Sequence, residues 1–443
     1  MVIKSFLKWQ IMKTVKNKQV VTFLSGSAGE LDWMLPILDY LSKLQFEIKI
    51  IYLTRHVKKS VDHNSLLRDY ISQPNNKIEA ISIGGHFTEM IDKLGYLVHR
   101  INIKLNKPKL LSVFFYIIDY VCRRVFEINL PKHLLINQGE STLIFSESPS
   151  LRKPRDQWIK KMFNKSIFFY CPHSTHIYTS DLDRKYPELG YIDVNKKHFL
   201  LMGHPSDYFP VDEESEYAAP DLEKVFIGHP KYSRLWLNTR QKEARSFRSS
   251  FAKRKKSNIL VISRGHGGYI DEEFQKYLVQ TTVQVIQDQT PNYNLLVKKH
   301  PRETNSHWDK IIKDHPSIRI VEDHILDIAS KVDFAISFWS SGAIDCATLG
   351  VPVVEFYDPN KHPKQQIPEG ENFTTIYRKL GLVYPANNEL ELASIIARLL
   401  GENFEMQSVE THSFYSDLMN RSNNWKTPIG KILAANGYVS LNL

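Results

Sequence analysis

Two adjacent hydroxyl side chains, Ser340 and Ser341, occupy a position in the sequence where an anion-binding site is expected. An apolar run of strand length, Val332 to Phe338, precedes them, and Gly342 leads into a segment of helical composition, Ala343 to Leu349. In a strand–turn–helix unit the turn lies at the carboxyl edge of the sheet, where the helix N-terminus and both hydroxyls can donate hydrogen bonds to a phosphate. The alternative is that the serines only cap the helix.

A histidine and an arginine follow a second predicted strand, Tyr293 to Lys299. Pro301 cannot continue a strand ladder, so the strand ends there and leaves His300 and Arg302 at the carboxyl edge. Because the carboxyl ends of parallel strands meet at one edge of a sheet, both side chains are expected near the serine pair.

A glycine-rich turn follows a third predicted strand, Asn258 to Ile262, and reads SRGHGG. Small residues let the backbone approach a diphosphate closely, and the guanidinium of Arg264 can pair with phosphate. A flexible turn without a function is the alternative. The predicted donor-phosphate site consists of Arg264, Gly265, His300, Arg302, Ser340, Ser341 and Gly342.

These motifs, His300-Pro301 and about forty residues later Ser340-Ser341, resemble the C-terminal half of GT-B transferases that build bacterial surface polymers. The families are the teichoic acid glycerophosphotransferases and the HP-motif capsule transferases that use nucleotide-activated sialic acid or Kdo. In both, the HP histidine and the hydroxyls before the later helix bind the donor phosphate. The resemblance implies an α/β GT-B fold, with two doubly wound Rossmann-like domains facing a cleft. It also implies a nucleotide-activated donor of the CDP, CMP or UDP type and no cofactor.

The length and the order of elements predict two domains. With 443 residues, the chain exceeds the size of a single core. Short apolar strands alternate with helices, which indicates parallel sheets with helices on both faces. We place an acceptor-side domain at residues 1–235, a polar linker that ends in four basic residues at 236–256, and the donor-binding domain at 257–443. By resemblance, the tail of the second domain crosses back onto the first.

Two histidines and a glutamate are candidates for the general base. The predicted strand Ser166 to Cys171 is followed by PHSTH, and the strand Thr142 to Ser146 ends at Glu147. An imidazole near its intrinsic pKa can take a proton from an acceptor hydroxyl. The teichoic acid enzymes carry a His in a comparable loop beside Trp and Gly, whereas this loop reads CPHS, so the choice between His173 and His176 stays open. Structural hydrogen bonding is the alternative, and this spacing without a carboxylate or cysteine trio predicts no metal site.

The turn after the first predicted strand contains Gly26, Ser27 and Gly29. It resembles the acceptor-side opening loop of GT-B enzymes and, equally, that of the nucleotide-sugar 2-epimerases that share their fold. It is not GxGxxG, so no dinucleotide site is predicted. An epimerase is therefore the alternative function, and it would need paired carboxylates in the cleft. The scattered candidates are Glu147, Asp323 and Asp345.

Basic and apolar side chains are interleaved in two places. Met1 to Lys18 contains five lysines and no acid, and residues 100–132 contain seven basic and five aromatic residues against two acids. Such segments are typical of surfaces that lie on anionic membranes. A frayed terminus and core helices with basic rims are the alternatives. No window reaches the ~20 apolar residues that span a bilayer, so we expect a cytoplasmic protein, peripheral at the inner face of the membrane.

The remaining composition is that of an ordinary soluble globular protein. Three distant cysteines, Cys122, Cys171 and Cys346, indicate a reducing compartment and no disulfide framework. A net charge of +10 would also suit a nucleic-acid-binding protein, but the basic clusters match no nucleic-acid module, so no nucleic-acid partner is predicted. Together with these motifs, the resemblance to GT-B transferases implies a metal-independent transferase. It would move a sugar or polyol phosphate from a nucleotide-activated donor to a cell-surface glycan or lipid-linked acceptor.

Overall fold

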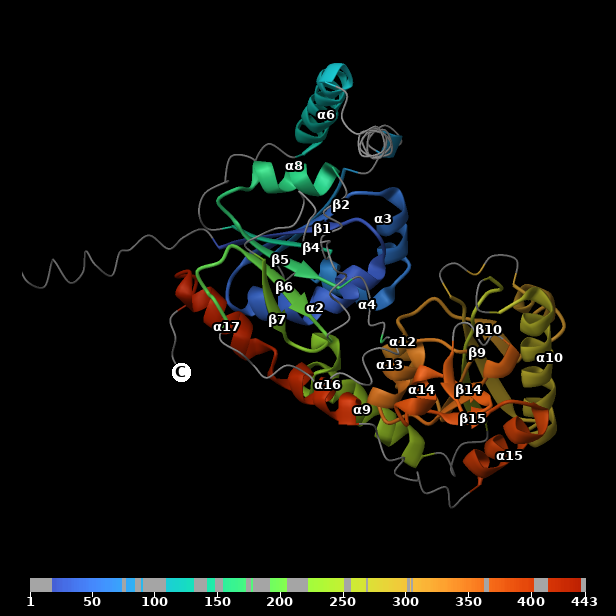
Figure 1. The fold of residues 1–443 in the computed structure, drawn as a ribbon. Coiled ribbons are helices and arrows are strands. Elements are labelled where there is room, and N and C mark those ends of the chain that lie inside the picture. The colour runs from blue at the N-terminus through green and yellow to red at the C-terminus, as the bar shows by residue number, and fades with distance from the viewer. Residues whose placement is uncertain are drawn as a thin grey trace, which may run out of the picture.

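Two parallel sheets organise the protein, and helices cover both faces of each (Figure 1). The computed structural model describes residues 18–73, 77–83, 89–90, 109–130, 142–147, 154–172, 177, 192–204, 222–250, 256–267, 270–300, 303, 306–361, 366–401 and 413–439. The α/β class predicted from the sequence is confirmed.

The first sheet has the strand order β3-β2-β1-β4-β5-β6-β7, and all of its pairs are parallel. Its strands are β1 (Gln19–Leu24), β2 (Glu47–Tyr52), β3 (Ile78–Ser82), β4 (Thr142–Glu147), β5 (Ile167–Cys171), β6 (His198–Met202) and β7 (Leu222–Phe226). Alternate residues of β1 enter two different cores, because successive side chains of a strand point to opposite faces. Val20 and Leu24 lie in one core, and Val21 and Phe23 lie in the other.

Separate groups of helices build these two cores (Figure 1). One face is covered by α2 (Ala28–Lys43), α3 (Arg55–Asp62), α4 (Ser65–Ser72) and α17 (Lys426–Ala435). The other is covered by α6 (Lys109–Asn129) and α8 (Pro154–Met162). None of the helices in the described part of the chain is long and apolar enough to cross a membrane.

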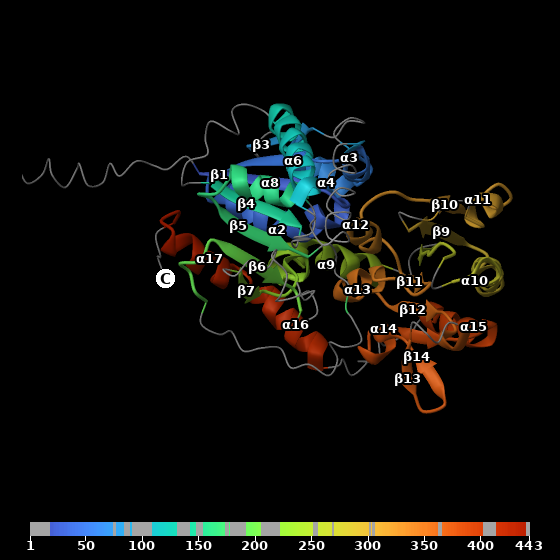
Figure 2. The ribbon, with the colours of Figure 1, turned by 45° about the horizontal axis from the view of Figure 1, so that its top comes forward.

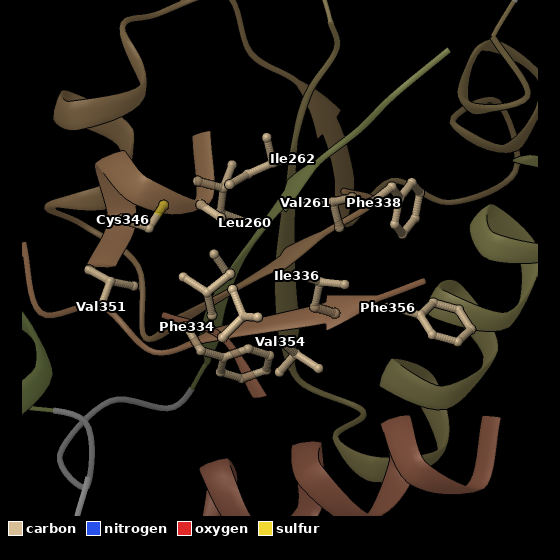
Figure 3. Close-up of a cluster of buried hydrophobic side chains, with 14 of the residues drawn as sticks. Leu260, Val261, Ile262, Phe334, Ile336, Phe338, Cys346, Val351, Val354 and Phe356 are labelled. Atoms are coloured by element: carbon tan, nitrogen blue, oxygen red, sulfur yellow. The ribbon is translucent and has the colours of Figure 1, made fainter. Parts of the chain in front are cut away.

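The second sheet has the strand order β10-β9-β8-β11-β12-β15, again all parallel. Its strands are β8 (Ser257–Ile262), β9 (Tyr293–Lys298), β10 (Ile318–Ile320), β11 (Phe334–Ser337), β12 (Val353–Phe356) and β15 (Tyr384–Ala386), with a hairpin of β13 (Ile367–Glu369) and β14 (Asn372–Thr374) beside it. Its helices are α10 (Glu272–Gln289), α11 (Trp308–Ile311), α12 (Ile325–Ala329), α13 (Gly342–Thr348), α14 (Ile376–Lys379) and α15 (Glu389–Leu400). Figure 3 shows the apolar side chains of β8, β11 and β12 meeting in its core.

Two connections join the sheets. The short turn η3 (Pro230–Tyr232) and helix α9 (Arg234–Ser249) follow β7 and include much of the segment predicted as a linker, 236–256. This segment is helical up to Ser249, and its Leu237 and Ala244 are buried in the core of the second sheet. The chain returns through α16 (Ser413–Asn424) and α17, which lie beside β7 in Figures 1 and 2.

Candidate active site

Three adjacent strands of the second sheet end at the same level. Ile262, the last residue of β8, pairs with Lys298 of β9 on one side and with Ser337 of β11 on the other. Arg264 and His300 each lie two residues beyond this row, and Ser340 lies three residues beyond it. The fold therefore brings three of the predicted phosphate-binding groups to one sheet edge.

The Arg264 side chain lies directly against the turn that follows β11. Its Nη1 donates to the carbonyl oxygen of Trp339 at 2.7 Å, and its Cζ lies 4.6 Å from the centre of the Trp339 ring. Trp339 has a φ of 55°, which is uncommon for a residue with a side chain, and its ring stacks on Tyr357 at 5.8 Å. The Arg264 contacts therefore connect the β8 turn to Trp339, the residue just before the serine pair.

Ser340 and Ser341 form the turn between β11 and α13. The Ser340 amide donates to Ser337 Oγ at 3.1 Å, and Ser340 Oγ accepts a long bond of 3.4 Å from the Gly342 amide. The Ser341 hydroxyl caps no backbone N–H of α13, so helix capping does not account for this serine. Gly342 permits a close approach of α12, because a Cβ there would lie 2.5 Å from Ile325 Cδ1.

The other predicted phosphate-site residues lie in the β8 and β9 loops. The His300 amide donates to Glu303 Oε2 at 3.2 Å, and a Cβ on Gly265 would lie 3.0 Å from Glu303 Cγ. Arg302 lies outside the described residues. Glu303 is a buried member of this edge that carries no local sequence signal, and the sequence analysis does not include it.

The predicted acceptor-side loop is held by a buried carboxylate. Glu30 is fully buried and accepts from the amides of Ser25 at 2.9 Å, Ser27 at 2.8 Å and Gly26. Ser27 Oγ in turn accepts from the Gly29 amide at 3.1 Å, which completes a capping box at the start of α2. The Ser27-x-x-Glu30 spacing is a signal for this motif that the sequence analysis did not use.

Of the three candidate bases, Glu147 is the one that lies among the described residues. It ends the central strand β4, pairs in register with Cys171 of β5, and accepts from Ser25 Oγ at 3.1 Å. His173 and His176 follow β5 but lie outside the described residues. Glu147 therefore lies at the carboxyl edge of the first sheet, beside the loop that opens α2.

No protein-family model and no curated protein sequence matches the chain. Solved structures do. A structure of the wall teichoic acid polymerase TagF soaked with CDPG has a TM-score of 0.51 at 13% identity, over 98% of this chain and 95% of that chain. The UDP-GlcNAc 2-epimerase from Methanocaldococcus jannaschii has a TM-score of 0.50 at 12% identity, over 94% of this chain and 99% of that chain. The chain has the GT-B fold. The fold predicted from the sequence is confirmed, and it is common to a polymerase and an epimerase.

A buried cluster of charges joins the two halves of the GT-B fold. Lys231 of η3 contacts Asp32 Oδ2 of α2 and Asp345 Oδ1 of α13, both at 2.9 Å. His324, the N-cap of α12, places Nε2 2.8 Å from Asp32 Oδ1, while its Nδ1 accepts from the Leu326 amide. Nε2 of this imidazole is therefore the protonated nitrogen and donates to Asp32.

Opposing effects set the pKa values in this cluster. Burial alone would raise the pKa of Asp32, but Lys231 and His324 outweigh it and hold that pKa well below its usual range. Burial would lower the pKa of Lys231, but Asp32 and Asp345 raise it well above the ordinary value. Asp32 and Lys231 are therefore both charged at neutral pH.

This cluster also bears on the alternative epimerase function in the GT-B fold. An epimerase needs paired carboxylates for proton abstraction, and Asp345 is in an ion pair with Lys231. Glu147 lies at the edge of the other sheet and is hydrogen-bonded to Ser25. Asp323 lies in the β10–α12 loop and is exposed. These three carboxylates therefore lie on separate elements, and Asp345 is already paired with Lys231.

Proposed function

We propose that the protein is a metal-independent transferase that moves a sugar or polyol phosphate from a nucleotide-activated donor to a cell-surface glycan or lipid-linked acceptor. The observation that carries this proposal is the row formed by Ile262, Lys298 and Ser337, beyond which Arg264 and His300 extend. A cationic, hydroxyl-lined edge suits a diphosphate. The GT-B neighbour TagF was soaked with CDPG, which is consistent with a CDP-type donor.

The reaction divides between the two sheet edges. Arg264, His300 and the serine pair stabilise the negative charge that develops on the departing phosphate. The stabilising groups are thus protein side chains. The acceptor hydroxyl loses its proton to a base at the first edge, where His173, His176 and Glu147 are the candidates. Glu147 pairs in register with Cys171, and Cys171 precedes His173 by two residues in the chain.

The acceptor is proposed to be reached at an anionic membrane surface through one face of α6. Ile117, Val121 and Ile128 are 53%, 51% and 81% exposed, and their spacings of four and seven residues place them on one side of the helix. Arg124 lies 5.3 Å from the ring of Tyr120 between them. An exposed apolar stripe with basic and aromatic neighbours suits the interface of an anionic bilayer.

The opposite face of α6 is buried against the first sheet. Cys122 and Phe126 are buried there, and the Phe126 ring lies 5.9 Å from that of Trp158 in α8. Among the described residues, the helix is therefore anchored to the sheet by its inner face.

Nucleotide binding tests the proposed function. Calorimetry with CDP, CMP, UDP and GDP should show that wild-type protein binds at least one of them. His300→Ala and the double change Ser340→Ala with Ser341→Ala should weaken that binding about tenfold or more, because each removes hydrogen-bond donors to phosphate. His315→Ala is the matched control, since this histidine follows α11 and contacts Gln287 instead. Wild-type protein that binds none of the four nucleotides would refute the proposal.

A further inference from the structure

One buried carboxylate connects the two loops that carry Arg264 and His300. Glu303 lies three residues after His300 and is only 6% exposed. Its amide donates to the His300 carbonyl oxygen at 2.8 Å. The side chain is thereby directed from the β9 loop toward the β8 loop, as its contacts show.

Four donors surround this carboxylate. Oε1 accepts from Ser263 Oγ at 3.0 Å, from Gln275 Nε2 at 3.2 Å and from Ser306 Oγ, while Oε2 accepts from the His300 amide at 3.2 Å. None of these donors is a formal cation, and together they fill most of the acceptor capacity of an ionised carboxylate. Such a network fixes the loops that supply its members.

The β8 loop is held by this network at three consecutive residues. Ser263 Oγ donates to Glu303 and accepts from the buried Trp308 Nε1 at 2.9 Å, so its hydroxyl has one orientation. Gln275 Nε2 also donates to the Arg264 carbonyl oxygen at 3.0 Å. Gly265 packs against Glu303 so closely that any side chain there would require a shift of a few tenths of an ångström. The glycine at this position is thus explained by the approach of Glu303.

We propose that Glu303 is the positioning residue that fixes the β8 and β9 loops side by side, so that Arg264 and His300 face one donor phosphate. The functional part of this inference rests on the proposed function. Because the carboxylate accepts hydrogen bonds from the interior and from the loop backbone, Glu303 acts through these loops and is not itself a phosphate ligand. Its negative charge would repel a phosphate, so its value to the site lies in geometry.

Two substitutions separate geometry from charge. Glu303→Ala removes all four acceptor contacts and should weaken nucleotide binding about tenfold or more, since the two loops lose their common partner. Glu303→Gln keeps an oxygen for the three Oε1 contacts and loses only the bond from the His300 amide, because its NH₂ group cannot accept. Binding by Glu303→Gln should therefore recover to within about fivefold of wild type.

Asp333→Ala is the matched control. Asp333 is also a buried carboxylate of the second sheet, but it precedes β11 at the opposite, amino edge and accepts from the Asn258 amide at 2.8 Å. This variant should lose stability and keep wild-type nucleotide affinity. If Glu303→Ala binds CDP, CMP, UDP and GDP as wild type does, or if Asp333→Ala loses affinity equally, the positioning role is refuted.

Hydrogen exchange provides a readout that does not need a nucleotide. In Glu303→Ala, amide exchange at His300 and across residues 263–265 should accelerate at least tenfold, while exchange in α15 stays unchanged. Unchanged exchange in both loops would overturn the inference, whatever the binding result. Accelerated exchange in a protein whose wild-type form binds no nucleotide would leave Glu303 as the organiser of these loops and would refute the proposed function alone.

Discussion

Replacing Lys231 by Met removes the only ammonium from the buried charge cluster that the structure describes between the two sheets. Lys231 is 4% exposed, and its two carboxylate partners each lie 2.9 Å from Nζ. Methionine fills a similar volume, so the change mainly deletes the charge. Asp32 keeps its hydrogen bond from His324 at 2.8 Å, whereas Lys231 is the one cation among the described contacts of Asp345.

The expected loss of unfolding free energy is about 4 kcal/mol at pH 7.5, because removing one partner of a buried ion pair costs roughly 3–5 kcal/mol. Lys58→Met is the matched control, since the Lys58–Asp62 pair is about half exposed on both sides and such pairs contribute about 0–1 kcal/mol. Adding Asp32→Asn and Asp345→Asn to Lys231→Met should restore much of the stability, because no buried charge is then left uncompensated.

The loss in Lys231→Met should depend on pH. In wild type the pKa of Asp32 is held well below its unfolded value of about 3.9, so this carboxylate stabilises the fold above that pH and loses the effect only in stronger acid. Without Lys231, we expect burial to outweigh the remaining partner, His324, and to raise the pKa of Asp32 above its unfolded value. Protonation then relieves the penalty as the pH falls, so the deficit should be smaller at pH 4.5 than at pH 7.5.

Urea unfolding followed by tryptophan fluorescence at both pH values measures these differences. A deficit below about 1 kcal/mol at pH 7.5 would refute the reasoning. So would a deficit that grows or stays constant on going to pH 4.5, because protonation of a carboxylate that lost Lys231 would then not relieve it.

Three further outcomes are expected. If one of the two histidines is the base, His173→Ala or His176→Ala should lower kcat by roughly 10²–10⁴ at unchanged nucleotide affinity. Near-normal turnover in both variants would instead assign the base to Glu147. Gly228→Ala should lose more than about 2 kcal/mol in urea unfolding, because φ is 70° and a Cβ would collide with the backbone of α16; a smaller loss would show that α16 moves freely. Val121→Glu with Ile128→Glu should abolish sedimentation with anionic vesicles and leave turnover on a soluble acceptor intact; unchanged sedimentation would contradict the α6 proposal.

The elements of the fold were largely readable from local patterns. Apolar runs with glycine or proline after them predicted β8, β9 and β11 to within two residues at either end. Strand β3 was not predicted, because it lies at the sheet edge, buries Ile78 and Ile81 only partly, and has no continuous apolar run. Helix α9 was predicted as a linker because its buried residues, Leu237 and Ala244, are separated by charged and polar ones.

The residues that fix the site were harder to predict, because their contacts span the chain. Glu30 accepts from the Ser27 amide only three residues away, so the S-x-x-E spacing could have predicted this contact. Glu303 meets Ser263 from 40 residues away, and Lys231 meets Asp32 from 199 residues away. Such pairings follow from the arrangement of whole elements, so no window of the sequence contains them.

The return of α17 to the first sheet affects the order in which the protein can mature. Trp425, Ile429 and Ile432 are buried with Leu35 and Leu38 of α2 in one apolar core. These two parts of the core are about 390 residues apart in the chain, so α2 is synthesised long before α17. The second sheet is complete in the chain before α17 emerges, whereas the core under α2 stays open until then. During translation the first sheet is therefore the part that exposes an apolar face until α17 covers it.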